Sequence, residues 1–392
     1  METTPTEKPF FVPGYIPQLD GLRGVAILMV LVGHSRFLEA LPHLKNLEYT
    51  RFGVDLFFVL SGFLITGILL DSKGSEHYFR NFYARRALRI WPLYYVILFM
   101  AFVVTPMLVP STKSATGVWP AFIFYVQNIA LVYRDTYPFG LGATWSLAVE
   151  EQFYLTWPLL VFLLKRRTLA FVSFSLAVVS LSLRMIFHFA GAAPGFVHFF
   201  TLSRLDAIAL GALAALWWRS PGYTLILWRT RACQFLVLGV TGVILARVVM
   251  HRNSSSVGYA FLAIGFTGLL GLSLSSDPRS SCLGRCLTAG WLRYVGKISY
   301  GIYLLHYPIF LLLARVTLSQ HFLALNPIAG NLLEFAGQML LAILAASISW
   351  RFLEKPILQL KGRFPSGSKL HWPAARESRL WRCRAVAESR PA

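Results

Sequence analysis

The first apolar run of the chain, GLRGVAILMVLVGH at 21–34, places Arg23 and His34 eleven residues apart. On a helix that spacing is about three turns, so both side chains lie on nearly one face, about 16 Å apart along the axis. A guanidinium can hold an anionic carrier, and an imidazole can act as a general base. Taken alone, the pair fits equally well a snorkelling arginine and a structural histidine.

A second cluster is basic and lies in HYFRNFYARRALRIWPLYY, residues 77–95, which contains Arg85, Arg86 and Arg89. Arg86 and Arg89 are three residues apart and share a helix face. Guanidinium groups bind phosphates through paired hydrogen bonds, so this face is a candidate phosphate site. Spacing alone favours the simpler interpretation, which is the basic flank of a membrane span.

Two adjacent carboxylates, Glu150 and Glu151, lie in ATWSLAVEEQFYLTWP at 143–158. Neighbouring helical residues point about 100° apart, so only one of them can face a bundle interior fully. That one could orient a histidine or bind an acceptor hydroxyl. The alternative is a carboxylate at the level of the lipid headgroups, which the flanking Trp and Tyr residues also fit.

Further ionisable residues fall within or beside apolar runs. Arg204 and Asp206, in SRLDAIALG, are offset by two and do not share a helix face, so we expect each to have a different partner. His306 lies in the middle of SYGIYLLHYPI, where a structural hydrogen bond is the commoner role. No P-loop, dinucleotide fingerprint or HExxH motif is present, and no metal site is predicted.

The elements that must position these residues are membrane-spanning helices. Hydrophobic residues make up 56% of the 392 residues and charged residues only 14%, which few soluble domains approach. In lipid the backbone must satisfy its own hydrogen bonds, so an all-α bundle is predicted. Ten spans are expected, at about 20–38, 53–71, 90–109, 145–164, 169–190, 198–218, 233–250, 257–275, 298–315 and 329–350.

Charge fixes the expected orientation of the bundle. Basic clusters recur at every second loop, which predicts that both termini are cytoplasmic and accounts for the net charge of +20 without a nucleic-acid partner. Residues 1–360 are expected to form one membrane domain, and 361–392 a basic, disordered tail. Between the third and fourth spans, WPAFIFYVQNIALVY is expected to form a short re-entrant or interfacial helix on the outer side.

Seven motifs, in order, resemble acyltransferase family 3, the integral-membrane O-acyltransferases that modify bacterial polysaccharides and other acceptors. They cover about residues 15–360 and read LDGLRGVAILMVLVGH, RFGVDLFFVLSGFLIT, FYARRALRIWPLYY, TWSLAVEEQFYL, SRLDAIALG, SYGIYLLHYPI and WRFLEKPI. The family's Arg-x10-His motif matches Arg23 and His34, its third-span arginines match Arg86 and Arg89, and its WSLxxE glutamate matches Glu150. The resemblance is to the stand-alone type, without an additional hydrolase-like domain.

The resemblance implies a multi-pass protein of the bacterial inner membrane that moves an acyl group, usually acetyl, from acyl-CoA to a hydroxyl. Acyl-CoA is a co-substrate, and no permanently bound cofactor is implied. Arg23, Arg86 and Arg89 would hold its phosphates at the cytoplasmic end. His34 would act as general base or as acyl carrier, and Glu150 would orient the imidazole or the acceptor. Asp206, Arg204, His306 and Glu151 are expected to bind substrate or support the site.

The acceptor and the oligomeric state stay open. O-antigen, exopolysaccharide, lipo-oligosaccharide, peptidoglycan and a small metabolite are all compatible acceptors. One alternative function is a transporter of a sugar or lipid whose interior charges line a path, but no pair of inverted repeats with broken mid-span helices is visible. A non-catalytic membrane partner would not explain so many costly interior charges.

Overall fold

The computed structural model describes residues 15–35, 52–108, 117–133, 138–220, 224–250, 255–314 and 327–365. Every regular element in these ranges is helical, as predicted. The main helices are α1 (Pro17–His34), α2 (Gly53–Ser72), α3 (Tyr78–Phe99), α7 (Trp145–Leu163), α8 (Arg166–Phe189), α10 (Leu205–Trp218), α11 (Leu225–Met250), α12 (Ser255–Ser275), α15 (Ser299–Leu313) and α17 (Pro327–Ser349).

Shorter helices connect or extend the main ones. They are η3 (Met100–Val104), α4 (Thr105–Leu108), α5 (Trp119–Ile123), α6 (Gln127–Val132), η5 (Gly142–Thr144), α9 (Pro194–His198), η6 (Thr201–Ser203), α13 (Cys282–Leu287), α14 (Gly290–Lys297), η8 (Trp350–Glu354), α18 (Lys355–Gln359) and η9 (Leu360–Arg363).

The chain is a multi-pass membrane protein. Within the described ranges, six helices are long and apolar enough to cross a membrane: α2, α3 with its extension to Leu108, α8, α11, α12, and α17 with its extension to Arg363. Two shorter apolar helices are α10 and α15. Each of the ten predicted spans overlaps one of the main helices, although α3 and α11 begin earlier than predicted and α10 begins later. The count of ten and the cytoplasmic termini remain predictions.

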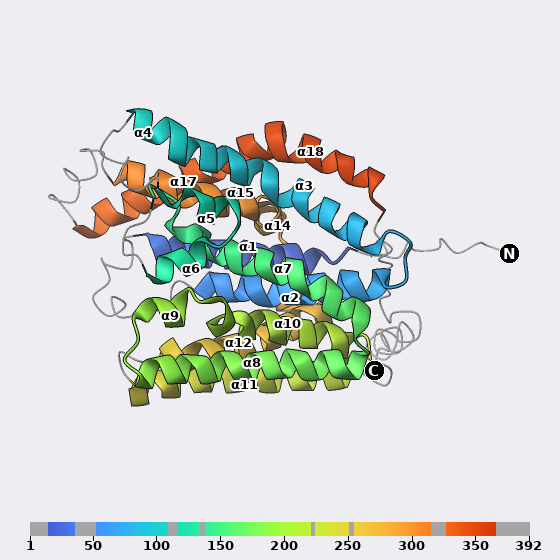
Figure 1. The fold of residues 1–392 in the computed structure, drawn as a ribbon. Coiled ribbons are helices and arrows are strands. Elements are labelled where there is room, and N and C mark those ends of the chain that lie inside the picture. Colours follow the sequence, from blue (N-terminus) through green and yellow to red (C-terminus); the bar gives the residue numbers. More distant parts are fainter. Residues whose placement is uncertain are drawn as a thin grey trace, which may run out of the picture.

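The long helices run side by side, as Figure 1 shows. Helices α1, α2 and α7 lie in the middle of this view, between a group made of α8, α10, α11 and α12 and a group made of α3, α15, α17 and α18. Helix α2 contacts helices from both groups as well as α1 and α7. The residues expected to do chemistry lie on these central helices and on the elements beside them.

The predicted end of the first span is wrong. The first span was expected to run to about 38, but α1 ends at His34, because Ser35 adopts an extended conformation with ψ of 159°. His34 therefore lies in the last turn of the helix rather than well inside a span. Residues 36–38 lie outside the described residues.

The aromatic segment WPAFIFYVQNIALVY forms two short helices, α5 and α6, rather than the single helix predicted. The break is at Tyr125, whose φ of 55° is left-handed. Its ring stacks on Tyr94 with centroids 4.5 Å apart, and the Tyr94 hydroxyl donates to the Phe122 carbonyl at 2.8 Å. These contacts satisfy the interrupted backbone and fix the fold of the segment against α3.

The last span continues past residue 350 through η8, α18 and η9. The beginning of the predicted tail is therefore helical, and it packs on α3: the Arg85 Nη1 atom donates to the carbonyl of Phe364 at 2.9 Å and to that of Lys361 at 3.3 Å. Residues 366–392 of the predicted tail lie outside the described residues.

Helices α2 and α10 pack through two glycines. A Cβ atom at Gly62 would lie 1.9 Å from the Ile208 carbonyl oxygen, and one at Gly211 would lie 2.1 Å from the Val59 oxygen. Such distances leave no room for a methyl group, so both glycines permit close backbone contact.

We expect Gly211→Ala to destabilise the protein by about 1–3 kcal/mol, because α2 and α10 must move apart. The unfolding temperature of the detergent-solubilised protein measures this. Gly337→Ala is the matched control, since no described atom lies within 4 Å of that Cβ position. Equal effects of the two substitutions would show that the close contact is not important.

Candidate functional site

Two histidines meet between α1 and α15. The rings of His34 and His306 have centroids 5.0 Å apart at an interplanar angle of 66°, and the Tyr307 ring lies 5.6 Å from His34. His306 is fully buried, whereas His34 is partly exposed. The sequence singled out both histidines but did not indicate that they are neighbours, because 272 residues separate them.

Backbone hydrogen bonds define which ring nitrogen of each histidine carries a proton. The Nδ1 atom of His34 lies 2.9 Å from the Val30 carbonyl oxygen, and that of His306 lies 2.7 Å from the Tyr303 oxygen. A carbonyl oxygen only accepts, so each Nδ1 carries a proton and each neutral ring keeps its lone pair on Nε2. The Nε2 atom of His306 is buried and has no hydrogen-bond partner in the described part of the chain.

The position of His34 at the end of α1 favours a proton acceptor. The carbonyl end of a helix carries a partial negative charge, which stabilises the cation that forms when an imidazole takes up a proton. His34 is in the last turn of an 18-residue helix. An Nε2 lone pair with this support is suited to general-base chemistry.

Glu150 faces the interior of the bundle rather than the headgroups. Its carboxylate accepts a hydrogen bond of 2.6 Å from Ser61 of α2, and Tyr154 donates to the same serine at 3.1 Å. The charges of Arg86 and Arg23 act on Glu150, and its own charge acts on Tyr303. That Glu150 orients the imidazole or the acceptor stays a prediction. Ser61 was not predicted.

Glu151 is the second carboxylate of the pair. Its Oε1 atom is buried without a hydrogen-bond partner in the described ranges. It lies within electrostatic range of Glu150 and Arg86. The two glutamates therefore share one environment near the basic cluster, although they point in different directions from α7.

The basic cluster consists of Arg23, Arg86, Arg89 and Lys361, whose charges act on one another. Among the described residues, Arg23 forms an ion pair with Asp20 at 3.4 Å. The buried Nε atom of Arg86 has no hydrogen-bond partner among the described residues. Arg89 lies over the rings of Tyr300 and Trp350, at 5.8 and 5.7 Å. Positive charges gathered in this way are stable only with anions nearby.

Lys361 is the member of the cluster that the sequence analysis missed. It follows the last span and was assigned to a disordered tail, whereas η9 holds it beside α3. A basic residue directly after an apolar helix was the only available signal, and positive-inside charge explains such residues equally well.

Two buried ion pairs form a separate cluster. Arg204 donates to Asp55 at 2.8 Å, and Arg184 donates to Asp206 at 2.6 Å. The prediction that Arg204 and Asp206 have different partners is confirmed. Asp55 was not singled out, and Arg184 had no assigned role. The Tyr259 ring lies 3.6 Å from the Arg204 guanidinium carbon and completes the cluster.

This cluster joins helices. Its charged side chains come from α2, α8 and α10 or from the residue before α10, and Arg184 also donates to the Ser256 carbonyl of α12 at 2.8 Å. Arg204 and Asp206, expected to bind substrate or support the site, thus have structural partners.

The two candidate centres lie at opposite ends of α1. Arg23 belongs to the basic cluster and His34 to the histidine pair, and one continuous helix separates them by about 16 Å. The arrangement can hold a long anionic molecule by its charged end and present its far end to a base. Among the described residues, no group of three or more His, Cys, Asp or Glu side chains could bind a metal.

Comparisons with known proteins give a consistent answer. Residues 16–351 match the family described as an acyltransferase domain, acyltransferase family 3. The chain is 31% identical to the O-acetyltransferase OatA of Staphylococcus aureus (strain NCTC 8325 / PS 47) over 88% of its own length and 58% of that protein. It is 30% identical to the peptidoglycan O-acetyltransferase OatA of Listeria monocytogenes, over 88% and 56%.

The chain thus spans somewhat more than half the length of these relatives. No solved structure matches it.

The ion-pair cluster generates a stability prediction. Arg184→Met should destabilise the protein by about 3–5 kcal/mol, because Asp206 is left buried and unpaired. The double variant Arg184→Met/Asp206→Leu should lose less than the sum of the single variants. Equilibrium unfolding in mixed micelles measures this cycle. Strictly additive losses would show that the pair does not act as a unit.

Proposed function

Because the chain belongs to acyltransferase family 3, we propose that it transfers an acyl group, acetyl in the first instance, from acyl-CoA to a glycan hydroxyl. The observation that carries the proposal is the histidine pair at one end of α1 with the basic cluster at the other. The names of the relatives, which are O-acetyltransferases, support acetyl as the group transferred. They do not favour a transporter.

We propose that His34 is the general base. Its Nε2 atom removes the proton from the acceptor hydroxyl while the oxygen attacks the thioester carbonyl carbon. The tetrahedral intermediate then collapses, the C–S bond breaks, and the imidazolium returns the proton to the leaving thiolate. The products are the ester and free coenzyme A. An alternative within the same site is attack by His34 itself, with an acyl-imidazole passing the group to the acceptor.

The basic cluster is the proposed site for the phosphates of acyl-CoA. Arg23, Arg86 and Arg89 supply the guanidinium groups, and Lys361 adds a fourth cation from η9. The rise of about 16 Å from Arg23 to His34 is comparable to the length of an extended pantetheine arm. Bound phosphates would neutralise Arg86, Arg89 and Lys361, which form no ion pair with a carboxylate among the described residues, and would add to the Asp20 contact of Arg23.

Neighbouring groups have supporting roles in this scheme. Glu150, held by Ser61, balances the charge of Arg86 and positions the donor between the two centres. Glu151 contributes to the same balance. His306 packs on His34 and fixes its ring. The Arg204–Asp55 pair holds the start of α10 to α2, and the Asp206–Arg184 pair holds α10 to α8.

For the acceptor, we propose a bacterial cell-envelope glycan. The Listeria relative is named a peptidoglycan O-acetyltransferase, which favours peptidoglycan over O-antigen, exopolysaccharide or lipo-oligosaccharide as the first acceptor to test. The protein would reside in the cytoplasmic membrane, with ten spans and both termini in the cytoplasm, where acyl-CoA is made. Release of free coenzyme A by the protein in lipid, given acetyl-CoA and a panel of glycans, tests the activity.

His34→Ala should lower kcat/KM by a factor of about 10²–10⁴, because the base is lost. Acceptor-dependent release of coenzyme A measures the effect. His188→Ala on α8, which the proposal gives no role, should leave the rate unchanged. Near-normal transfer by His34→Ala would refute the assignment, and a severe loss in His306→Ala alone would move the base to that residue.

Lys361→Gln and Arg86→Gln should each raise KM for acetyl-CoA by about tenfold or more, because each removes a charge-assisted contact to phosphate. With acetyl-pantetheine, which lacks the nucleotide, the same variants should match the unsubstituted protein, whereas His34→Ala should stay defective. Equal defects with both donors would show that the cluster does not bind the nucleotide end.

A further inference from the structure

A cavity at the helix ends of α10, α11 and α12 lies apart from the proposed active site. It has a volume of about 270 Å³ and is partly open to the outside. Its lining comes from all three helices and consists of Ala214, Trp217, Trp228, Arg231, Ala232, Phe235, Thr267 and Gly271. We infer that this cavity binds an anionic phospholipid, with the phosphate on Arg231 and an acyl chain along α11.

The walls of the cavity include aromatic side chains that are held by contacts between helices. The Trp228 indole nitrogen donates to the Gly271 carbonyl at 2.9 Å, which joins α11 to α12. Trp217 and Phe235 have ring centroids 5.9 Å apart at 29°, which joins α10 to α11. The shape of the cavity is therefore held by contacts between helices, and does not depend on a bound molecule.

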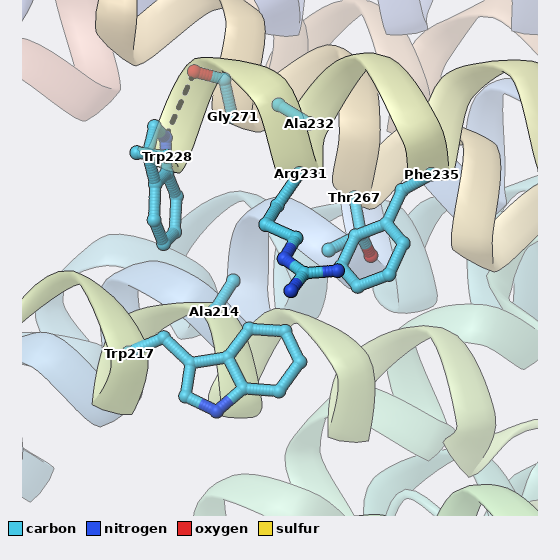
Figure 2. Close-up of a pocket in the computed structure, with 8 residues that line it drawn as sticks. All are labelled: Ala214, Trp217, Trp228, Arg231, Ala232, Phe235, Thr267 and Gly271. Atoms are coloured by element: carbon cyan, nitrogen blue, oxygen red, sulfur yellow. Dashed lines mark hydrogen bonds between the residues drawn. The ribbon is translucent and has the colours of Figure 1, made fainter. Parts of the chain in front are cut away.

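Arg231 gives the cavity its charge. Figure 2 shows its guanidinium directed into the cavity, between Trp217 and the Thr267–Phe235 wall. The hydrogen bond that it makes within the described ranges is to the amide oxygen of Gln234, at 3.2 Å, and no carboxylate there pairs with it. Four of its five N–H donors thus remain for an anion.

Two nearby arginines have stronger hydrogen-bond partners than Arg231 has. Arg219, which follows α10, donates to both carboxylate oxygens of Asp71 at 2.9 and 2.8 Å. Arg166 donates to the Leu216 carbonyl at 2.7 Å. Of these three arginines, Arg231 is the one with only a neutral partner among the described residues, and it is the one that lines the cavity.

The surroundings favour a lipid over a soluble anion. Arg231, Phe235 and Leu238 follow each other at helical spacing, and Leu245 continues the same face. Leu238 is 49% exposed and Leu245 is 56% exposed, on a helix whose apolar window is only 22% buried. In the bilayer this face is in contact with lipid, so a phospholipid can lay an acyl chain along it while its phosphate reaches Arg231; a free phosphate gains nothing from this face. Basic pockets between membrane helices with tryptophan near the helix ends are typical lipid sites.

Native mass spectrometry of the full chain in detergent tests the inference, with phosphatidylglycerol and phosphatidylcholine of identical acyl chains as probes. We expect a retained phosphatidylglycerol adduct that Arg231→Gln weakens by about tenfold or more. Arg229→Gln is the matched control: it removes the same charge from the same helix but does not line the cavity. Because Arg231 is exposed, its substitution should not affect folding.

Three outcomes would overturn the inference. Equal loss in Arg231→Gln and Arg229→Gln would mean that general surface charge holds the lipid. Equal retention of phosphatidylcholine would mean that the site does not select anionic lipid. Displacement by glycerophosphoglycerol, the headgroup without chains, as effective as displacement by the lipid would mean that the site binds a soluble anion. None of these results depends on whether the protein transfers acyl groups.

Discussion

A charge buried among membrane helices is costly unless a partner of opposite charge or a polar ligand accompanies it. This constraint divides the ionisable residues of the chain into two sets. In one set the protein supplies the partner, as in the pairs Arg204–Asp55 and Arg184–Asp206. In the other set the described residues form no ion pair: Glu150 and Glu151 act on Arg86 only at longer range, and Lys361 lies among arginines. In the proposed function these residues mark the place where a ligand would bind.

The buried ion pairs hold together the helices that position the proposed site. The ion pairs connect α2 with α8 and α10, and the glycine contacts bring the α2 and α10 backbones together. Helix α2 also supplies Ser61, which holds Glu150 of α7. The position of Glu150 relative to Arg86 therefore depends on charges that have no part in the proposed reaction.

Helix α1 sets the distance between the two ends of the proposed site. An uninterrupted helix fixes the rise from Arg23 to His34, whereas side chains on separate loops would not. The last turn of the same helix supplies both the Nδ1 acceptor, the Val30 carbonyl, and a favourable field for the imidazolium. In the proposed mechanism, helix α1 thus sets both the distance that the donor spans and the nitrogen of His34 that carries the proton.

Periodicity and composition were sufficient to predict an all-helical membrane bundle, the approximate position of each long helix, and the separation of Arg23 from His34, because these are properties of local sequence. The offset of Arg204 from Asp206 likewise predicted separate partners. Only the tertiary structure gives roles to Asp55, Arg184 and Lys361, because their partners lie far away in the chain. The contact of His34 with His306 likewise depends on the fold. The break at Tyr125 also depends on tertiary contacts, since the Tyr125 ring stacks on Tyr94 of α3 where the left-handed backbone ends α5.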